Sequence, residues 1–452
     1  MKKSSVKLTT SQFILLGFLV VILVGSFLLA LPISSADGRA IPYLDALFTA
    51  TTSTCVTGLV TVPTVSTFST FGHVVILLLI QIGGLGIVAV LTGFMLMFNR
   101  RLGVQDRLLI QDAFNLNTLS GLVKFVKKVF IGTAIVEGVG ALLYMLVFVP
   151  QFGPRGIWIS VFNSVSAFCN AGIDIISENS LCDYALNPLV NFVTAALIIL
   201  GGLGYIVWWD VIRVMELKRH KRVKLWKSLT LHSKIAVTMT LFLLISGTVL
   251  IYLFEANNPK TFGDYTVPQK LMASFFQSVT TRTAGFATVP QENLTNPTAL
   301  LSVLLMFIGG SPVGTAGGVK TVTMVVIIAT ALSVVKNKNE INLFGRKITE
   351  TAIRKAAAVT TVSFVIAFIS AIALSFVTDA AALDVIYETV SATATVGLTR
   401  SLTPGLNEWG KLIIIATMYF GRVGPISLAF ALNGRGKNEN IIKNPTEEIS
   451  VG

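Results

Sequence analysis

The stretch Phe48-TATTSTCVT-Gly58 sets the organisation of this chain, because its plan returns three more times further along. Each copy has an aromatic residue ten positions before a glycine. The later copies read Phe162-NSVSAFCNA-Gly172, Phe275-FQSVTTRTA-Gly285 and Tyr387-ETVSATATV-Gly397. Their glycines are 114, 113 and 112 residues apart. Self-similarity at a fixed period is typical of repeat architectures, so the sequence predicts four copies of one structural unit.

The composition places these units in a membrane. Hydrophobic residues make up 53% of the 452 residues and the mean hydropathy is +0.77. Charged residues make up only 13%, against about 25% in soluble domains, which argues against a soluble enzyme. The three cysteines have no metal-ligand spacing. Eight apolar runs have the length of a membrane span, at 13–32, 72–98, 129–149, 190–212, 231–254, 298–334, 352–377 and 409–432.

Four further apolar segments are too hydrophobic for exposed loops and too short to span a bilayer. They contain the repeated stretches and cover 43–57, 158–171, 268–284 and 383–396. About a dozen helical residues descend roughly 18 Å, and about five extended residues climb back roughly 16 Å. Each segment is therefore expected to dip into the membrane and return to the same side.

These elements predict an all-α polytopic membrane protein with four pseudo-repeats of helix, pore helix, filter loop and helix around one central pore. The expected domains are repeat 1 at 10–100, repeat 2 at 120–215, repeat 3 at 230–336, repeat 4 at 350–434 and a C-terminal tail at 435–452. Non-helical backbone at membrane depth is tolerated only where protein buries it or water surrounds it. The four returning loops are therefore expected to surround a pore.

Basic residues decide the expected orientation. The chain has 35 Lys and Arg against 22 Asp and Glu, a net charge of +13. Twenty-six of the basic residues fall in the termini and in three connections on one side, and seven fall on the other side. The positive-inside rule then places both termini in the cytoplasm. The basic run 213–227 is expected to contact anionic membrane lipid or a soluble regulator, and no nucleic-acid partner is expected.

The shared glycines are the predicted selectivity filter. Glycine adopts backbone angles closed to other residues, and carbonyl oxygens can replace the hydration shell of a cation. Thr395-Val396-Gly397 matches the T-V-G of potassium-channel filters. The alternative is four packing glycines in tight turns, which the matched spacing disfavours. The predicted potassium-binding carbonyls belong to Val56, Thr57, Asn170, Ala171, Thr283, Ala284, Thr395 and Val396.

A glycine-rich interruption in the sixth span is the predicted gate. Residues 309–321 carry five glycines and a proline, which cannot continue a regular helix. The predicted gate residues are Gly309, Gly310, Gly314, Gly317, Gly318, Lys320 and Arg422. A harmless kink is the alternative. A phosphate-binding P-loop fails, because Val319 stands where that motif needs glycine. An arginine within a span needs water or a partner, whereas Lys320 is expected to snorkel towards the inner surface rather than lie deep.

Three carboxylates near the spans have two interpretations each, and one arginine has a single one. Glu137 is either a coupling carboxylate or a partner for polar groups of a neighbouring repeat, and the second is favoured. Asp45 and Asp384 either concentrate cations at the outer mouth or favour a helix N-terminus. Arg282 is expected to face the protein behind the filter and brace it, because exposure to the ions would oppose conduction.

Together these motifs resemble the Trk/Ktr/HKT superfamily of potassium transporters, and most closely its bacterial Ktr-type membrane subunit. The resemblance covers roughly 10–435 and rests on four filter glycines, the glycine-rich segment and the last-span Arg422. It implies potassium uptake, a gating role for the glycine-rich loop and Arg422, and possible dependence on sodium. In plant relatives a serine at the first glycine accompanies sodium transport, so Gly58 favours potassium.

The resemblance also implies partners. They are a second copy of the chain in a homodimer, with the C-terminal tail at the contact, and an octameric cytosolic ring that binds nucleotide. ATP or ADP is then expected only on that partner, and no covalent cofactor is expected on this chain.

Two other classes of protein compete with a potassium-selective, channel-like protein driven by the membrane potential. An ion-coupled secondary transporter with discontinuous helices at the midplane would usually show two inverted repeats, whereas this chain has four parallel ones. An intramembrane hydrolase needs a buried nucleophile and base, and no such pair is evident in the sequence. No catalytic residue is therefore expected, and the chain is not expected to be an enzyme.

Overall fold

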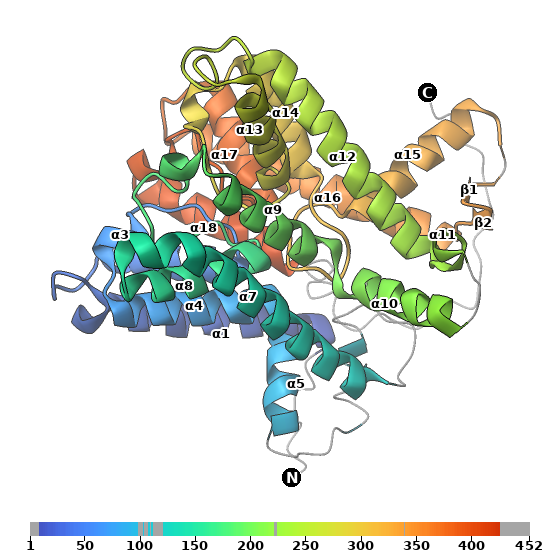
Figure 1. The fold of residues 1–452 in the computed structure, drawn as a ribbon, viewed down its shortest axis with the longest axis horizontal. Helices are drawn as coiled ribbons and strands as arrows, with labels where there is room; N and C mark the ends of the chain where they lie inside the picture. The colour runs from blue at the N-terminus through green and yellow to red at the C-terminus, as the bar shows by residue number, and fades with distance from the viewer. Residues whose placement is uncertain are drawn as a thin grey trace.

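The computed structural model describes residues 9–97, 121–220, 224–338 and 340–424, with residues 103, 107, 108, 110 and 111. Most of the described chain is helical (Figure 1). Four helices are long and apolar enough to cross a membrane: α1 (Thr10–Ala30), α7 (Leu122–Phe152), α12 (Leu231–Glu255) and α16 (Glu350–Ser375). The predicted tail at 435–452 lies outside the described residues.

A shorter helix follows each long one and packs against it. These helices are α2 (Tyr43–Cys55), α8 (Arg155–Cys169), α13 (Val267–Thr280) and α17 (Ala382–Ala394). Small residues permit the close packing: the Ser164 hydroxyl donates to the Glu137 carbonyl oxygen, and the Ser278 hydroxyl donates to the Leu244 carbonyl oxygen at 3.1 Å. Most residues of the four short helices are buried, so the protein surrounds helices that do not span its full thickness.

Another helix follows each buried short one. These helices are α4 (Thr70–Leu85), α9 (Pro188–Leu203), α14 (Asn296–Phe307) and α18 (Glu408–Val423). Three of them continue into α5 (Ile87–Met97), α10 (Tyr205–His220) and α15 (Thr321–Val335). The remaining elements are the short helices α3 (Thr64–Thr67) and α11 (Leu225–Ser228), four 3-10 turns, and a hairpin of β1 (Asn342–Leu343) and β2 (Arg346–Lys347).

Two of the expected straight spans are bent. The chain turns by 99° between α4 and α5, and by 93° between α9 and α10. The hinge residues Gly86 and Gly204 have φ of 86° and 85°, a region that glycine enters freely. The runs 72–98 and 190–212 are therefore broken helices. Counting each bent pair as one span gives up to six spans in the described chain, and the expected eight stay a prediction.

Helix contacts follow the order of the chain and then close on themselves. α4 packs on α8, α9 on α13 and α14 on α17. α18 packs on α2 and touches α1, so the last helices meet the first ones. Figure 1 shows α1, α4, α8 and α7 side by side, with α18 and then α17 above them in this view. The short helices are thereby held around a common centre.

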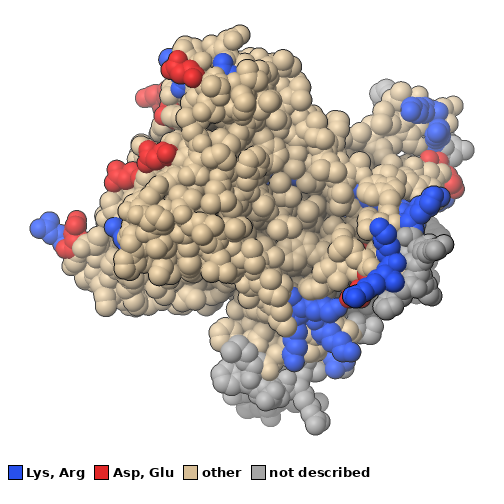
Figure 2. Space-filling model, viewed as in Figure 1, with Lys and Arg blue, Asp and Glu red and all other residues tan. Residues whose placement is uncertain are grey.

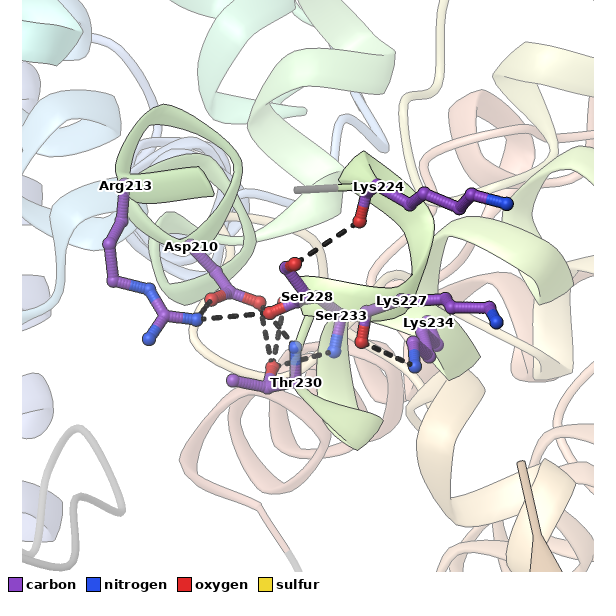
Figure 3. A network of polar contacts seen from close by, with 8 residues as sticks. All are labelled: Asp210, Arg213, Lys224, Lys227, Ser228, Thr230, Ser233 and Lys234. Atoms are coloured by element: carbon purple, nitrogen blue, oxygen red, sulfur yellow. Dashed lines mark hydrogen bonds and ion pairs between the residues drawn. The ribbon is translucent and has the colours of Figure 1, made fainter. Parts of the chain in front are cut away.

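Charge gathers at one end of the molecule. Figure 2 shows Lys and Arg concentrated around α10, α11 and the hairpin, while most of the visible acidic residues lie towards the opposite end. At the basic end, Asp210 accepts from Arg213 at 2.6 Å and from the amide and hydroxyl of Thr230 at 2.8 Å each. Figure 3 shows this network joining α10 to α12, with Lys224 and Lys227 directed away from Asp210. On the hairpin, the hydrogen bond from Lys347 holds the pKa of the Glu340 carboxyl below its ordinary value.

Candidate cation pathway

The four repeated stretches share an unusual backbone conformation. The residue two positions before each shared glycine is left-handed: φ is 56° at Val56, 60° at Asn170, 61° at Thr283 and 53° at Thr395. Such angles are costly for residues other than glycine, and particularly for β-branched ones. Strain repeated at the same position in four loops indicates that the surrounding structure imposes it on a functional segment.

The shared glycines themselves meet in a closed ring. A Cβ atom built on Gly58 would lie 2.6 Å from the Ala171 carbonyl oxygen, and one on Gly172 would lie 2.5 Å from that of Ala284. A Cβ atom on Gly285 would lie 2.5 Å from the Val396 carbonyl oxygen, and one on Gly397 would meet the Thr57 carbonyl oxygen. Each glycine therefore faces the carbonyl of the residue just before the next glycine in chain order. Gly397 closes the ring, because it faces the carbonyl of Thr57, the residue just before Gly58.

Any side chain on this ring would fill its centre. A Cβ on Gly58 would come within 3.2 Å of the Gly172 Cα and 3.3 Å of the Gly397 Cα. A Cβ on Gly285 would lie 3.1 Å and 3.3 Å from the same two atoms. All four glycines also have positive φ, at 100°, 66°, 82° and 96° in chain order. Both the backbone angle and the space therefore require glycine at these positions.

A hydroxyl group ties the loop to its helix, and the sequence interpretation missed it. The Thr52 hydroxyl accepts from the Gly58 amide at 2.9 Å, and the Ser391 hydroxyl accepts from the Gly397 amide at 3.1 Å. Ser166 accepts from the Ile173 amide at 3.2 Å. In the third loop Thr280 donates to the Phe286 carbonyl oxygen at 2.6 Å. The available signal was a hydroxyl residue six positions before Gly58, Gly172 and Gly397 and five positions before Gly285.

The residues predicted to supply carbonyl ligands lie together in this ring. The carbonyls of Thr57, Ala171, Ala284 and Val396 face the neighbouring glycines, and Val56, Asn170, Thr283 and Thr395 are also buried. The side-chain hydroxyls of Thr57, Thr283 and Thr395 are buried and have no hydrogen-bond partner within the described chain. Buried oxygens of this kind suit a cation, because an unpartnered polar atom is costly.

A second set of glycines lets the following helices approach the ends of the short ones. Gly83 lies against the Thr54 carbonyl, Gly201 against the Phe168 carbonyl and Gly421 against the Thr393 carbonyl. Each of these carbonyls belongs to the residue four positions before a shared glycine. A side chain at Gly83, Gly201 or Gly421 would displace the loop, so these glycines support the ring from one side.

The third repeat departs from this plan between α14 and α15. Here residues 309–320 are not helical, and the segment folds back on itself. The Gly309 amide donates to the Val319 carbonyl oxygen at 2.9 Å, and the Thr321 amide donates to that of Gly310 at 3.0 Å. Gly317 lies against the Thr395 side chain. The segment is therefore packed directly beneath the fourth filter loop.

The same segment is fastened to the second repeat. The amides of Ser311 and Thr315 donate to carbonyl oxygens of Gly202 and Gly201, at 2.8 and 3.2 Å. The Thr315 hydroxyl is 3.1 Å from the Phe168 carbonyl and 2.8 Å from the Asn170 side chain. The segment and the second filter loop thus share hydrogen bonds, with Thr315 as the link.

Both cations predicted within the spans contact this segment. One Arg422 nitrogen donates to the Thr315 carbonyl oxygen at 2.6 Å, and another donates to the Gly83 carbonyl oxygen. The Lys320 ammonium donates to the Ala316 carbonyl oxygen at 2.5 Å. The expectation that Lys320 snorkels to the surface is therefore wrong, because its ammonium is bonded to a carbonyl oxygen of the folded-back segment.

A cavity of about 430 Å³ lies next to these groups. Its lining includes Gly83, Gly317, Lys320, Gly421 and Arg422. No Asp or Glu is among the described residues that line it. The predicted gate residues Gly314 and Gly318 line it too, whereas Gly309 and Gly310 pack behind them. A cation moving from the glycine ring through this cavity would therefore pass two fixed positive charges.

The acidic residues at the mouth of the pathway are paired. Asp45 accepts from Lys411 at 2.6 Å and from the Thr61 hydroxyl at 2.8 Å. Asp384 accepts from Arg400 at 2.6 Å. Because each carboxylate has a basic partner, neither presents a free negative charge to entering cations. Both also lie in the first turn of a short helix, as the helix-terminus reading expects.

The two other charged residues lie behind the loops. Glu137 accepts from the Gln81 amide at 3.3 Å, and it belongs to the second repeat while Gln81 belongs to the first. The favoured reading, a polar contact with a neighbouring repeat, matches this geometry. Arg282 is 7% exposed and donates to the Thr240 hydroxyl at 3.4 Å. Its side chain thus lies among α12 and the third loop rather than on the glycine ring.

A helical protein with several membrane-spanning helices and its loop backbone gathered around one axis belongs to the class of membrane transport proteins. The family model described as "TrkH: Cation transport protein" matches residues 9–440. The chain belongs to this cation transport family. The expected resemblance to the Trk/Ktr/HKT superfamily and the all-α membrane fold are confirmed, and the chain is a transporter and not an enzyme.

Individual relatives extend this result along the whole chain. The Ktr system potassium uptake protein B of Bacillus subtilis is 38% identical over 99% of this chain and 98% of its own length. The potassium/sodium uptake protein NtpJ of Enterococcus hirae is 36% identical over 100% of this chain and 99% of its own. The crystal structure of the potassium transporter TrkH from Vibrio parahaemolyticus has a TM-score of 0.75 at 15% identity, covering 95% and 86% of the two chains. That structure shows the shared fold.

Proposed function

We propose that this chain takes up potassium across the cell membrane and that the ions pass through the ring of Gly58, Gly172, Gly285 and Gly397. The observation that supports this most is the closed succession of glycine and preceding carbonyl around the ring. Backbone carbonyls arranged in this way replace the water around a bare cation. Relatives of similar length are named potassium uptake proteins.

In this proposal the ion is held by backbone oxygens and not by carboxylates. The ligands are the carbonyls of Val56, Thr57, Asn170, Ala171, Thr283, Ala284, Thr395 and Val396. The described residues contain no group of three His, Cys, Asp or Glu able to hold a metal ion. The unpartnered hydroxyls of Thr57, Thr283 and Thr395 fit the same role, because a cation supplies the contact that they lack.

The membrane potential drives uptake in this mechanism. An inside-negative potential of 100 mV favours entry by about 2.3 kcal/mol for each monovalent cation. Transport is then channel-like, because the ring offers a continuous path once the inner side is open. Dependence on sodium is part of the proposal, as the Enterococcus hirae relative is named a potassium/sodium uptake protein.

The folded-back segment at 309–321 serves as the gate. It packs beneath the fourth filter loop and carries Lys320, while Arg422 joins it to the first repeat. Two positive charges beside the inner cavity raise the barrier to a cation. Movement of the segment, which breaks its bonds to Arg422 and Gly202, would open the path.

The inner face is proposed to bind regulators and lipid. Exposed Arg213, Lys218, Arg219, Lys224 and Lys227 give it a positive surface, which supports the proposal that both termini lie in the cytoplasm. The partners are anionic membrane lipid, a second copy of the chain and an octameric cytosolic ring that binds ATP or ADP. Relatives named as parts of a Ktr system support a multi-component assembly.

Isotope flux into proteoliposomes tests the proposal. With an inside-negative potential, potassium and rubidium are expected to enter and sodium and lithium to be excluded. Equal entry of sodium and potassium would remove the selectivity claim. The break between α14 and α15 also resembles the discontinuous helices of secondary transporters. Flux that requires stoichiometric co-transport of a second ion would favour that alternative.

A further inference from the structure

Thr315 of the gate segment joins two other repeats through all of its polar groups. Its hydroxyl lies 2.8 Å from Asn170 Oδ1 and 3.1 Å from the Phe168 carbonyl oxygen. Its amide donates to the Gly201 carbonyl oxygen at 3.2 Å, and its carbonyl oxygen accepts from Arg422 at 2.6 Å. The residue is fully buried. One threonine of the third repeat therefore holds groups of the second and fourth repeats together.

The partner of this hydroxyl is part of the second filter loop. Asn170 follows the end of α8 and has the left-handed conformation, with φ of 60°. Asparagine enters this region more readily than β-branched residues do. The equivalent residues of the other loops are Val56, Thr283 and Thr395. The second loop is thus the one of the four that offers an amide side chain at this position.

The structure makes room for the contact between Thr315 and Asn170. A Cβ atom on Gly201 would lie 2.8 Å from both Asn170 Oδ1 and the Thr315 hydroxyl oxygen. Rotating the Asn170 amide by 180° would bring its Nδ2, which has no partner within the described chain, to the same hydroxyl. Thr315 would then accept from Asn170 and donate to Phe168. The link therefore persists in either orientation of the amide.

The gate segment meets the fourth filter loop differently. A Cβ atom on Gly317 would collide with the Thr395 hydroxyl oxygen, so these residues are in close contact. That hydroxyl has no hydrogen-bond partner within the described chain. The segment therefore packs against the fourth loop but is hydrogen-bonded to the second. Movement of the segment would break a specific bond only at Asn170.

We propose that Thr315 is a positioning residue for the glycine ring, and that it couples the gate to ion selectivity. The inference rests on the proposed function of the ring and the segment. While the segment stays in place, the Thr315 hydroxyl restrains Asn170, and the following carbonyl, that of Ala171, faces Gly58. When the segment moves, the buried amide loses its partner and the strained loop is free to relax. The ring then distinguishes potassium from sodium less well.

Flux into proteoliposomes tests this coupling. Thr315→Val removes the hydroxyl and keeps a similar shape, so the potassium-to-sodium flux ratio is expected to fall by about fivefold while potassium flux rises. Thr315→Ser retains the hydroxyl and should keep the wild-type ratio. Thr330→Val is the matched control, because that hydroxyl bonds to the carbonyl of Val326 within α15. Raised flux at an unchanged ratio in Thr315→Val would overturn the inference and leave the proposed gate intact.

Potassium binding provides a second test that does not depend on transport. The thermal unfolding midpoint of the full-length protein in detergent is expected to rise as potassium replaces choline, which gives an apparent dissociation constant. This constant is expected to be about fivefold higher in Thr315→Val, a difference of about 1 kcal/mol, and unchanged in Thr315→Ser. Thr315→Ala is the second variant if Thr315→Val fails to fold, with the same increase expected.

The two measurements separate the inference from the proposed function. Equal dissociation constants in the wild type and in the variants without the hydroxyl would overturn the positioning role of Thr315. Absent flux, together with potassium binding that weakens in Thr315→Val, would refute potassium uptake but support that role.

Discussion

The glycine ring and the gate segment are both glycine-rich, but they are built differently. The ring takes one glycine from each of four loops, and each loop repeats the left-handed residue two positions earlier. The gate segment belongs to the third repeat alone and is held by carbonyl contacts to the second repeat, Lys320 and Arg422.

The difference matches the two physical tasks that we propose for the ring and the segment. Surrounding an ion with oxygens on all sides needs a contribution from every repeat, so each loop is constrained alike. Blocking a path needs only one obstruction, so one repeat is enough to supply it. The other three repeats need no glycine-rich segment after their loops. The ring is therefore expected to tolerate no change at any glycine, whereas the gate is expected to respond to changes by opening.

Substitution of a ring glycine is expected to have the largest effect. In Gly397→Ala the new Cβ would meet the Thr57 carbonyl and lie 2.8 Å from the Gly58 Cα. Potassium flux in proteoliposomes is expected to fall to background. Gly138→Ala is the control, since that glycine is helical and a Cβ added there would meet no atom within 4 Å outside its own helix backbone. Wild-type flux in Gly397→Ala would show that the ring is not the path.

Removal of the gate arginine is expected to act in the opposite direction. Arg422→Ala removes two charge-assisted hydrogen bonds, each worth about 1.5–3 kcal/mol. Loss of about 1.4 kcal/mol from the barrier corresponds to tenfold, so flux is expected to rise by about tenfold or more. Arg354→Ala, an exposed arginine, should leave flux unchanged. If neither Arg422→Ala nor a shortened 310–318 segment raises flux, the proposed gate is refuted.

Loss of a hydroxyl tie is expected to blur selectivity without blocking the path. Ser391→Ala removes the acceptor of the Gly397 amide, at a cost of about 1 kcal/mol. The potassium-to-sodium flux ratio is expected to fall by roughly fivefold, since the fourth loop loses one of its restraints. The control Ser375→Ala removes an exposed hydroxyl on α16. An unchanged ratio in Ser391→Ala would mean that packing alone positions the loop.

Neutralising a paired carboxylate at the mouth is expected to have the smallest effect on potassium flux. Asp384 is bonded to Arg400, so Asp384→Asn removes no free negative charge from the entrance. The concentration of potassium that gives half-maximal flux is expected to change by less than about twofold. A larger increase, lost at high ionic strength, would instead show that Asp384 concentrates cations there.

Patterns along the chain were sufficient to predict the main parts of this structure. The period of the shared glycines, the apolar short segments and the run of glycines at 309–318 are local features of the sequence. Each has a direct physical consequence, such as a short buried helix or a break in a span. The family resemblance rested on the same residues and is confirmed.

Other features depend on contacts between distant residues and could not be predicted. The bends at Gly86 and Gly204 were missed, because a glycine within an apolar run is compatible with a straight helix. The Lys320 ammonium is bonded to a carbonyl of a segment that folds back only in three dimensions. The pairing of Asp45 with Lys411 joins the first and last repeats, and no local pattern indicates it.

The closure of the ring has a consequence for biosynthesis. Gly397 packs against Thr57 and Gly58, and α18 packs on α2, so the ring is completed by its most distant partners. The first loop emerges from the ribosome long before the segment that must complete its surroundings. Contacts of such sequence separation form late and slowly. Nascent chains are therefore expected to keep their first three loops unassembled in the bilayer until the final repeat has been inserted.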